Sequence, residues 1–519
     1  MLVNMNLLKT AEDYIMVPFT TRLAYLKTKT EIMYKASLMQ GKTGQGKTHL
    51  TAHKMIPALL DEGKKLVIVS APSYGILDIN MFKKGLAKYG DVKVVTDADE
   101  ALHRCLLNRR TVLVTIHPNI ISRKGRNFIA YLNNLLPNEY SIFIDEAHTW
   151  LVPHHSLYKG CRGHRANELT YKGALYKVLE TCKTNYLFWL TATPTNVQTG
   201  KLTYDGKLQC EIINELPPKH LTVDKLACLG NVEYYDPELT TNYLNQNGDE
   251  TLMDISIKVL AMLHRMRELE LRTGIKQTML VRTGTNASAD IFTNPHMVRK
   301  ILDKLVELAG YEMDDMLYGV TNQLGITLES PNDALRVVSD DITLQSYFDD
   351  NNHPVRIMLV IDKCYQGMSV NSMKNIVVWR TSTQADANGE PILDFGTQIA
   401  GRGSRPYAGE QELGEDHTFD SLKHLPLEEK KDIIEANTCY VILPDTPQAH
   451  EVGQLLEDKI LSSVEEFTEY FIDEDLKGIN FVVDEEVCDH CGAAKKYWRK
   501  DLVKDVEINV EEMDKLFAA

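Results

Sequence analysis

A glycine-rich segment of eight residues constrains the fold of this chain more than any other feature. Residues 41–48, GKTGQGKT, match the pattern G-x-x-x-x-G-K-[ST] at every fixed position. The short apolar run Ala36–Met39 precedes them, and a stretch of helical periodicity follows. Gly41, Gly44 and Gly46 let the backbone curl so that several N–H groups point at one phosphate, and the helix N-terminus adds a favourable dipole. The segment therefore predicts an α/β domain with a phosphate-binding loop between a strand and a helix.

Two side chains of this loop are suited to a nucleoside triphosphate. Lys47 is placed to neutralise charge on the β- and γ-phosphates, and Thr48 is placed to offer its hydroxyl to Mg²⁺. We therefore expect ATP and Mg²⁺ as cofactors.

Alternating apolar runs and helical stretches extend the α/β prediction over most of the chain. Runs of strand length that predict a buried parallel sheet are Lys35–Gln40, Leu66–Ala71, Thr111–Ile116, Ser141–Ile144 and Tyr186–Leu190. The pattern pauses in a region expected to be irregular, from about Thr195 to Gly248. It resumes with a helix at Thr251–Leu271 and strands at Gln277–Val281, Val355–Ile361 and Asn375–Trp379.

This pattern predicts two α/β lobes with parallel sheets. We expect the first lobe at residues 1–215, a connector at 216–250, the second lobe at 251–445 and a mostly helical acidic region at 446–519.

The charge of the chain is unevenly distributed. The formal net charge of the 519 residues is -15, which by itself argues against binding to a polyanion. Residues 408–519, however, hold 29 Asp and Glu against 11 Lys and Arg, whereas residues 1–407 hold 43 against 46. The body of the chain is therefore near neutral, and its local basic stretches can attract nucleic acid.

Cysteine usage and hydropathy indicate the cellular compartment of the protein. Nine cysteines are scattered along a long chain, as is typical of reduced cytoplasmic thiols. No apolar run reaches the roughly 20 residues that span a bilayer, so no membrane partner is expected. Cys488 and Cys491 have the spacing of half a zinc site, and the alternative is a pair of unligated thiols.

An acidic pair follows the strand at Ser141–Ile144. Because the carboxyl ends of parallel strands lie where ligands bind, Asp145 is placed to hold the Mg²⁺ shell. Glu146 is placed to polarise the attacking water as a general base. The alternative is an acidic helix start, since carboxylates favour the first turn of a helix.

Together with the phosphate loop, Asp145-Glu-Ala-His148 resembles the DEAH-type branch of superfamily 2 helicases and translocases. Compact bacteriophage-encoded helicases are similar in size, and an origin of that kind would place the chain in the cytoplasm of a host cell. The resemblance implies two RecA-like lobes, and it covers about Gln40 to Tyr407. In the first lobe it assigns coupling or nucleic-acid contacts to Ser70, Thr115, His117, His148, Thr191 and Thr193.

The second lobe carries two further motifs of this family. Gln366-Gly367-Met-Ser resembles the fifth motif, which assigns Gly367 to the nucleotide. Residues 398–405, QIAGRGSR, match Q-x-x-G-R-x-x-R at every fixed position. The resemblance places Gln398, Arg402 and Arg405 across the nucleotide from Lys47. Planar guanidinium groups suit the charge that spreads over a γ-phosphate during hydrolysis.

Two basic patches of the first lobe are candidates for the nucleic-acid path. One is formed by Arg123, Lys124 and Arg126, and the other spans His154–Arg165, with Tyr158 available to stack on a base. The alternative for each is a solvated loop. We expect single-stranded or duplex DNA in preference to RNA as the partner.

The same motifs leave other functions open. A translocase or remodeller that never separates strands shares them. So does an ATP-switched scaffold or the motor subunit of a restriction or defence complex. The acidic C-terminal region is either a solvated domain or a surface for a basic protein partner, or it covers the nucleic-acid groove as a charge mimic.

Overall fold

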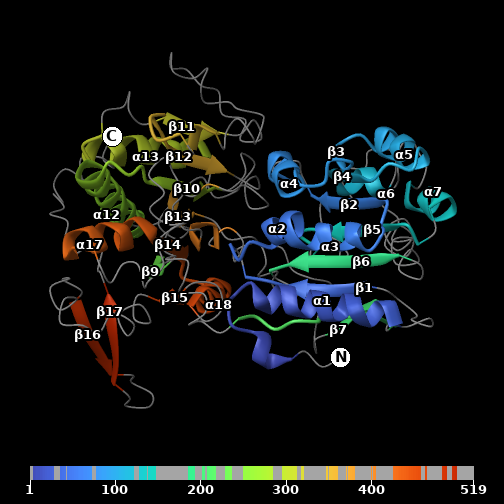
Figure 1. Ribbon diagram of the computed structural model, residues 1–519. Helices are drawn as coiled ribbons and strands as arrows, with labels where there is room; N and C mark the ends of the chain where they lie inside the picture. The colour runs from blue at the N-terminus through green and yellow to red at the C-terminus, as the bar shows by residue number, and fades with distance from the viewer. Residues whose placement is uncertain are drawn as a thin grey trace. The chain divides into compact units, whose positions relative to one another are not determined.

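The computed structural model divides the chain into two compact units (Figure 1). The first unit comprises residues 1–221 and 384–394, and the second comprises 222–383 and 395–519. The structure describes residues 4–28, 36–42, 44–72, 77–121, 128–136, 138–147, 185–192, 201–204, 207–217, 228–235, 249–283, 295–311, 317–320, 346–348, 350–360, 370, 372–379, 399, 401–404, 425–457, 462–463, 482–487 and 494–499.

A six-stranded parallel sheet forms the centre of the first unit, in the order β1-β6-β5-β2-β4-β3. Its strands are β1 (Ala36–Gln40), β2 (Leu66–Ala71), β3 (Lys93–Val95), β4 (Thr111–Ile116), β5 (Tyr140–Ile144) and β6 (Tyr186–Thr191). Its helices are η1 (Met5–Leu7), α1 (Asp13–Thr28), α2 (Lys47–Leu50), a π-helical turn η2 (Thr51–Met55), α3 (Ile56–Asp61), α4 (Ile79–Gly85), α5 (Ala98–Leu106), α6 (His117–Ile121) and α7 (Phe128–Leu135).

Successive residues of the strands enter two different hydrophobic cores, which places helices on both faces of the sheet. In β2, Val67 and Val69 pack with side chains of α1, α3 and α4. Leu66 and Ile68 pack instead with side chains of α5 and α7. Because both faces are covered, the strands are continuous apolar runs, as in other buried parallel sheets.

The second unit contains a seven-stranded parallel sheet in the order β11-β12-β10-β13-β14-β9-β15. Its strands are β9 (Cys228–Tyr235), β10 (Thr278–Arg282), β11 (Leu317–Val320), β12 (Val355–Val360), β13 (Met373–Val378), β14 (Thr438–Pro444) and β15 (Ser462–Ser463). Its helices are α12 (Asp249–Thr273), α13 (Pro295–Leu308), the 3₁₀ turn η8 (Gly401–Ser404), α17 (Leu427–Asn437) and α18 (Pro447–Leu455). Side chains of α12 and α13 pack in one core with residues of β10, β12, β13 and β14.

The structure confirms the predicted fold class, two α/β units with parallel sheets. Every strand predicted from an apolar run is present, with bounds shifted by no more than two residues, and the helix predicted at Thr251–Leu271 is α12. In the described part of the chain, no helix combines the length and the apolar character needed to cross a bilayer.

The region expected to be irregular, Thr195–Gly248, was interpreted wrongly. It contains an antiparallel hairpin of β7 (Lys201–Tyr204) and β8 (Lys207–Glu211), and it contributes β9 to the second sheet. β9 therefore lies within residues 216–250, the range expected as a connector. Its sequence, CLGNVEYY, mixes polar and apolar residues, and its pairing with β14 joins segments about 200 residues apart.

For the C-terminal region, residues 446–519, mostly helical structure stays a prediction. Its described part contains α18 and β15 together with an antiparallel hairpin of β16 (Val482–Val487) and β17 (Ala494–Arg499). The register pairs Glu485 with Lys496 and Glu486 with Lys495.

Candidate nucleotide-binding site

The phosphate loop links the end of β1 to the start of α2. Gly44 and Gly46 have φ angles of 78° and 81°, in the left-handed region that favours glycine. A Cβ atom on Gly41 would lie 2.9 Å from the Cγ and Cδ atoms of Lys47 and 3.0 Å from Cδ1 of Ile15. The loop is therefore wrapped closely around the first residue of α2, and its curvature depends on glycine at these positions.

Lys47 lies across the inside of this loop. Its Nζ atom donates hydrogen bonds to the carbonyl oxygens of Gly41, at 2.9 Å, and Lys42, at 3.1 Å. The ammonium group is thus held over the main chain that would surround a phosphate, where it can contact the anion with little rearrangement.

Gly41→Ala is expected to weaken ATP binding by about tenfold or more. The added methyl group must displace the Lys47 side chain, and a clash of this kind costs about 1–3 kcal/mol. Titration of the variant with ATP measures the effect. Gly63→Ala is the matched control, because nothing lies within 4 Å of a Cβ atom there, although its φ angle of 87° makes alanine strained. Equal losses of affinity in the two variants would attribute the effect to general destabilisation.

The acidic residue after β5 meets the loop directly. Asp145 is 3% exposed, and its Oδ2 atom accepts a 3.0 Å hydrogen bond from the Thr48 hydroxyl, 97 residues away in sequence. Its own N–H donates to the carbonyl of Ser70 at 2.7 Å. Burial, with a further contribution from the charge of Glu146, raises the pKa of Asp145 to about 6, while Lys47 and Thr48 act in the opposite direction.

Glu146 has an unusual backbone conformation. Its φ angle is 51°, in the left-handed region that is uncommon for a residue with a long side chain. The N–H of Glu146 donates to Oδ1 of Asp145 at 2.9 Å, and the N–H of Ala147 donates to the carbonyl of Leu190 in β6 at 2.9 Å. The surrounding strands thus fix a conformation that costs about 1–3 kcal/mol, as is common at functional sites.

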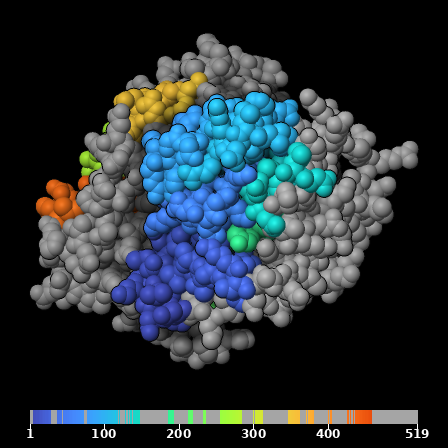
Figure 2. Space-filling view, turned by 45° about the vertical axis from the view of Figure 1, so that its right-hand side comes forward, coloured from blue at the N-terminus to red at the C-terminus, as the bar shows by residue number. Residues whose placement is uncertain are grey.

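The N-terminal segment supports the loop through Gln45, a contact that motif analysis did not reveal. The buried Gln45 side chain donates to the carbonyl of Ala11 at 2.7 Å and accepts from the N–H of Lys42 at 2.7 Å. Glu12, next to Ala11, forms an ion pair with Lys54 in η2, the turn that follows α2. In the space-filling view the N-terminal segment, in dark blue, lies against the segments that follow the loop (Figure 2).

β6 and Asn214 also contact the chain at the start of the loop. The N–H of Gly41 donates to the carbonyl of Thr191 at 3.0 Å, and Thr191 itself is fully buried. The N–H of Gln40 donates to Oδ1 of Asn214 at 2.9 Å. A displacement of β6 at Thr191 would therefore be transmitted to the start of the phosphate loop.

Two other predicted residues form a buried pair at the ends of β2 and β4. A 2.7 Å hydrogen bond joins Oγ of Ser70 to Nδ1 of His117. Thr115 in β4 is also buried, and its hydroxyl accepts a 3.0 Å hydrogen bond from the Asn119 side chain. Since the carbonyl of Ser70 accepts from the N–H of Asp145, Ser70 is one hydrogen bond and His117 two hydrogen bonds away from the acidic site.

Arg402 belongs to the second unit, where it is 5% exposed in η8. That it meets Lys47 across one nucleotide stays a prediction. Other predicted features lie outside the described residues: Arg123, Lys124, Arg126, His148, the patch His154–Arg165, Thr193, Gly367, Gln398, Arg405 and the pair Cys488 and Cys491.

The described residues of the first unit fit a nucleotide with a divalent cation. The loop is a cradle that a Cβ atom at Gly41 would fill, and an ammonium group already lies within it. Thr48 and Asp145 present a hydroxyl and a carboxylate to one point, the oxygen ligands that Mg²⁺ takes beside phosphate oxygens. Within the described ranges no group of three or more His, Cys, Asp or Glu side chains is placed to hold a metal ion.

Solved structures similar to this one include helicases. MrfA, a DUF1998 helicase bound to DNA, shares 13% identity at a TM-score of 0.47, and the match covers 94% of this chain and 57% of that one. The DEAH/RHA helicase HrpB of Escherichia coli shares 12% identity at a TM-score of 0.38, with 89% and 46% covered. The ATP-dependent Type ISP restriction-modification enzyme LlaBIII, bound to DNA, shares 12% identity at a TM-score of 0.46, with 87% and 33% covered.

The chain is similar in fold, at low identity, to structures that include helicases, the group that its motifs resemble. It spans between a third and just over half of the length of these three proteins. No protein-family model and no curated protein matches the sequence. At these identities and TM-scores the likeness carries nothing about activity, and the DEAH subtype and the bacteriophage origin stay predictions.

Proposed function

We propose that this chain is a nucleic-acid-stimulated ATPase of the helicase type. One observation carries the proposal: the Thr48 hydroxyl and the Asp145 carboxylate, far apart in sequence, lie 3.0 Å apart beside a glycine loop that holds an ammonium group. Hydrolysis of a nucleoside triphosphate needs a phosphate cradle, a cation site and a carboxylate near the attacking water. Residues suited to these tasks, Lys47, Thr48, Asp145 and the adjacent Glu146, belong to the first unit, which supports the proposal.

In this proposal each residue has one task. Lys47 binds the β- and γ-phosphates, and Thr48 and Asp145 hold Mg²⁺, which neutralises charge on the phosphates. Glu146 accepts the proton of the attacking water, and its position after Asp145 directs it to the same edge of the sheet. Residues of the second unit, chiefly Arg402, stabilise the charge that develops on the γ-phosphate.

Nucleic acid is the proposed stimulating partner. The whole-chain charge suggests repulsion of a polyanion. Residues 1–407 are nearly neutral, however, so they do not repel nucleic acid. The link from Ser70 and His117 to Asp145 offers a route by which a bound strand could change the acidic site.

The decisive measurement is phosphate release by the full chain with single-stranded DNA, duplex DNA and RNA in parallel. Hydrolysis that rises with nucleic acid, most strongly with DNA, is the expected result. Absence of hydrolysis under all conditions would refute the proposal. A rate of hydrolysis that does not change with nucleic acid would favour an ATP-switched scaffold. Separate displacement assays distinguish the motors: displacement of a triplex strand without separation of a duplex would identify a duplex translocase.

His117→Ala is expected to lower the ratio of stimulated to basal ATPase rate by about fivefold or more, a coupling of ordinary size. The change leaves the buried Ser70 hydroxyl without this partner, next to the carbonyl that holds Asp145. Steady-state rates with and without saturating DNA give the ratio. His103→Ala, at an exposed position of α5, is the control, and an unchanged ratio in His117→Ala would exclude the proposed route.

A further inference from the structure

The turn that carries Arg402 lies against the second sheet. η8 spans Gly401–Ser404 and contacts β13 and β14. Beneath it, in β13, Lys374 is 0% exposed, and its Nζ atom donates a 3.2 Å hydrogen bond to the carbonyl oxygen of Gly403. A buried ammonium group is costly unless it is hydrogen-bonded, so this contact with the main chain of η8 resists displacement.

Gly403 lets the turn approach the sheet closely. A Cβ atom at this position would lie 1.9 Å from Sγ and 2.8 Å from Cβ of Cys439 in β14. The Cys439 side chain therefore occupies the space that any side chain at Gly403 would need. Burial raises the pKa of the Cys439 thiol to about 12, so the group under the turn is neutral.

We infer that Lys374 is a positioning residue for Arg402. The absence of a side chain at Gly403 serves the same purpose, because it lets the turn lie close to the sheet. Lys374 holds the carbonyl that follows Arg402, and Cys439 defines how deeply the turn rests on the sheet. Neither Lys374 nor Gly403 occupies a fixed position of the pattern Q-x-x-G-R-x-x-R. The consequence for catalysis rests on the proposed function, whereas the effect on the turn does not.

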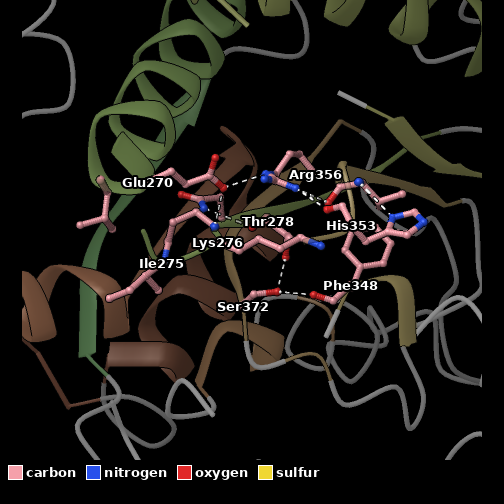
Figure 3. Close-up of polar contacts among 12 residues, drawn as sticks. Glu270, Ile275, Lys276, Thr278, Phe348, His353, Arg356 and Ser372 are labelled. Carbon is pink, nitrogen blue, oxygen red and sulfur yellow. Dashed lines mark hydrogen bonds and ion pairs between the residues drawn. The ribbon is translucent and has the colours of Figure 1, made fainter. Parts of the chain in front are cut away.

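The same unit offers a matched control for Lys374. Lys276 precedes β10, the parallel neighbour of β13, and is 2% exposed. Its Nζ atom donates to the carbonyl oxygens of Tyr347 and Asp350, each at 2.8 Å. Figure 3 shows Lys276 in a polar cluster that includes the ion pair of Glu270 with Arg356. Both lysines are thus buried and bonded to main-chain carbonyls, but the carbonyl that Lys374 holds belongs to η8, whereas those that Lys276 holds belong to Tyr347 and Asp350.

The test compares Lys374→Met with Lys276→Met in the full chain. The first measurement is amide hydrogen exchange of the peptide containing residues 401–404. We expect about tenfold faster exchange there in Lys374→Met, because a charge-assisted hydrogen bond to the turn is lost. In Lys276→Met, faster exchange is expected at residues 346–350 and not in η8.

The second measurement is ATP hydrolysis. In Lys374→Met, kcat is expected to fall by about tenfold or more, towards the value of Arg402→Ala, while KM for ATP changes by less than about threefold. Lys276→Met is expected to keep the parental kcat even if its melting temperature falls. This split distinguishes positioning of Arg402 from general destabilisation.

Gly403→Ala gives a test that does not depend on Lys374→Met being folded. The added methyl group collides with Cys439, so the variant is expected to lose kcat as Lys374→Met does. Cys439→Gly removes both atoms of the collision, and the double variant is expected to recover most of the lost kcat. Failure of this recovery would count against the role of Gly403.

The possible outcomes separate the inference from the proposed function. Parental exchange of residues 401–404 in a folded Lys374→Met variant overturns the inference. Faster exchange combined with parental ATPase in both Lys374→Met and Arg402→Ala supports the positioning of the turn and refutes the assignment of Arg402 to hydrolysis. A loss of kcat in Arg402→Ala but not in Lys374→Met overturns the inference and leaves the proposed function standing.

Discussion

Replacing Lys47 with alanine is expected to lower kcat/KM for ATP by about 10³-fold, a typical cost of removing a positioned charge from phosphoryl transfer. The ammonium group of Lys47 is held at 2.9 Å and 3.1 Å from two carbonyls of the loop, within the space that the phosphates would enter. Its removal leaves the most highly charged part of the nucleotide without this cation. The main-chain N–H groups of the loop cannot replace a full positive charge.

Phosphate release and equilibrium ATP binding should be measured together for this variant. Lys93→Ala is a suitable control, because Lys93 lies at the edge of the same sheet and its exposed ion pair with Glu100 contributes little to stability. We expect parental rates for Lys93→Ala. Robust hydrolysis by Lys47→Ala would show that ATP is bound elsewhere and that the loop has another purpose.

The parts of the fold that the sequence predicts are those whose formation depends on local pattern. β2 and β5 are continuous apolar runs because both of their faces are buried. The loop at Gly41–Thr48 is recognisable because phosphate binding constrains several neighbouring positions at once. In each case the residues that decide the structure are adjacent in sequence.

The parts that the sequence does not predict depend on distant partners. β9 contains polar residues at several positions and becomes a strand because β14 offers it a parallel edge. Gln45 contacts Ala11, and Asn214 contacts Gln40 over 174 residues, with no motif at either end. The hydrogen bond between Lys374 and Gly403 likewise forms only when the fold brings β13 and η8 together. Such contacts depend on tertiary structure, which periodicity does not describe.

The backbone of Glu146 is a further feature that periodicity does not reveal, and it sharpens the prediction for this residue. Glu146→Gln keeps the length of the side chain and is compatible with the same left-handed backbone at φ 51°. It removes the negative charge and, with it, the capacity to accept a proton from water. We therefore expect kcat to fall by about 10²–10⁴-fold, the usual contribution of a general base, while the dissociation constant for ATP changes by less than about threefold.

Single-turnover hydrolysis combined with direct ATP binding measures both quantities for this variant. Glu139→Gln is the matched control: Glu139 precedes the amino end of the same strand β5, where its partly exposed carboxylate pairs with Lys65. Turnover at the parental rate in Glu146→Gln would mean that another group accepts the proton. Loss of binding together with turnover would mean that Glu146 supports the nucleotide or the cation site. Only retained binding with lost turnover fits a residue that acts on water, because that step comes after the nucleotide is held.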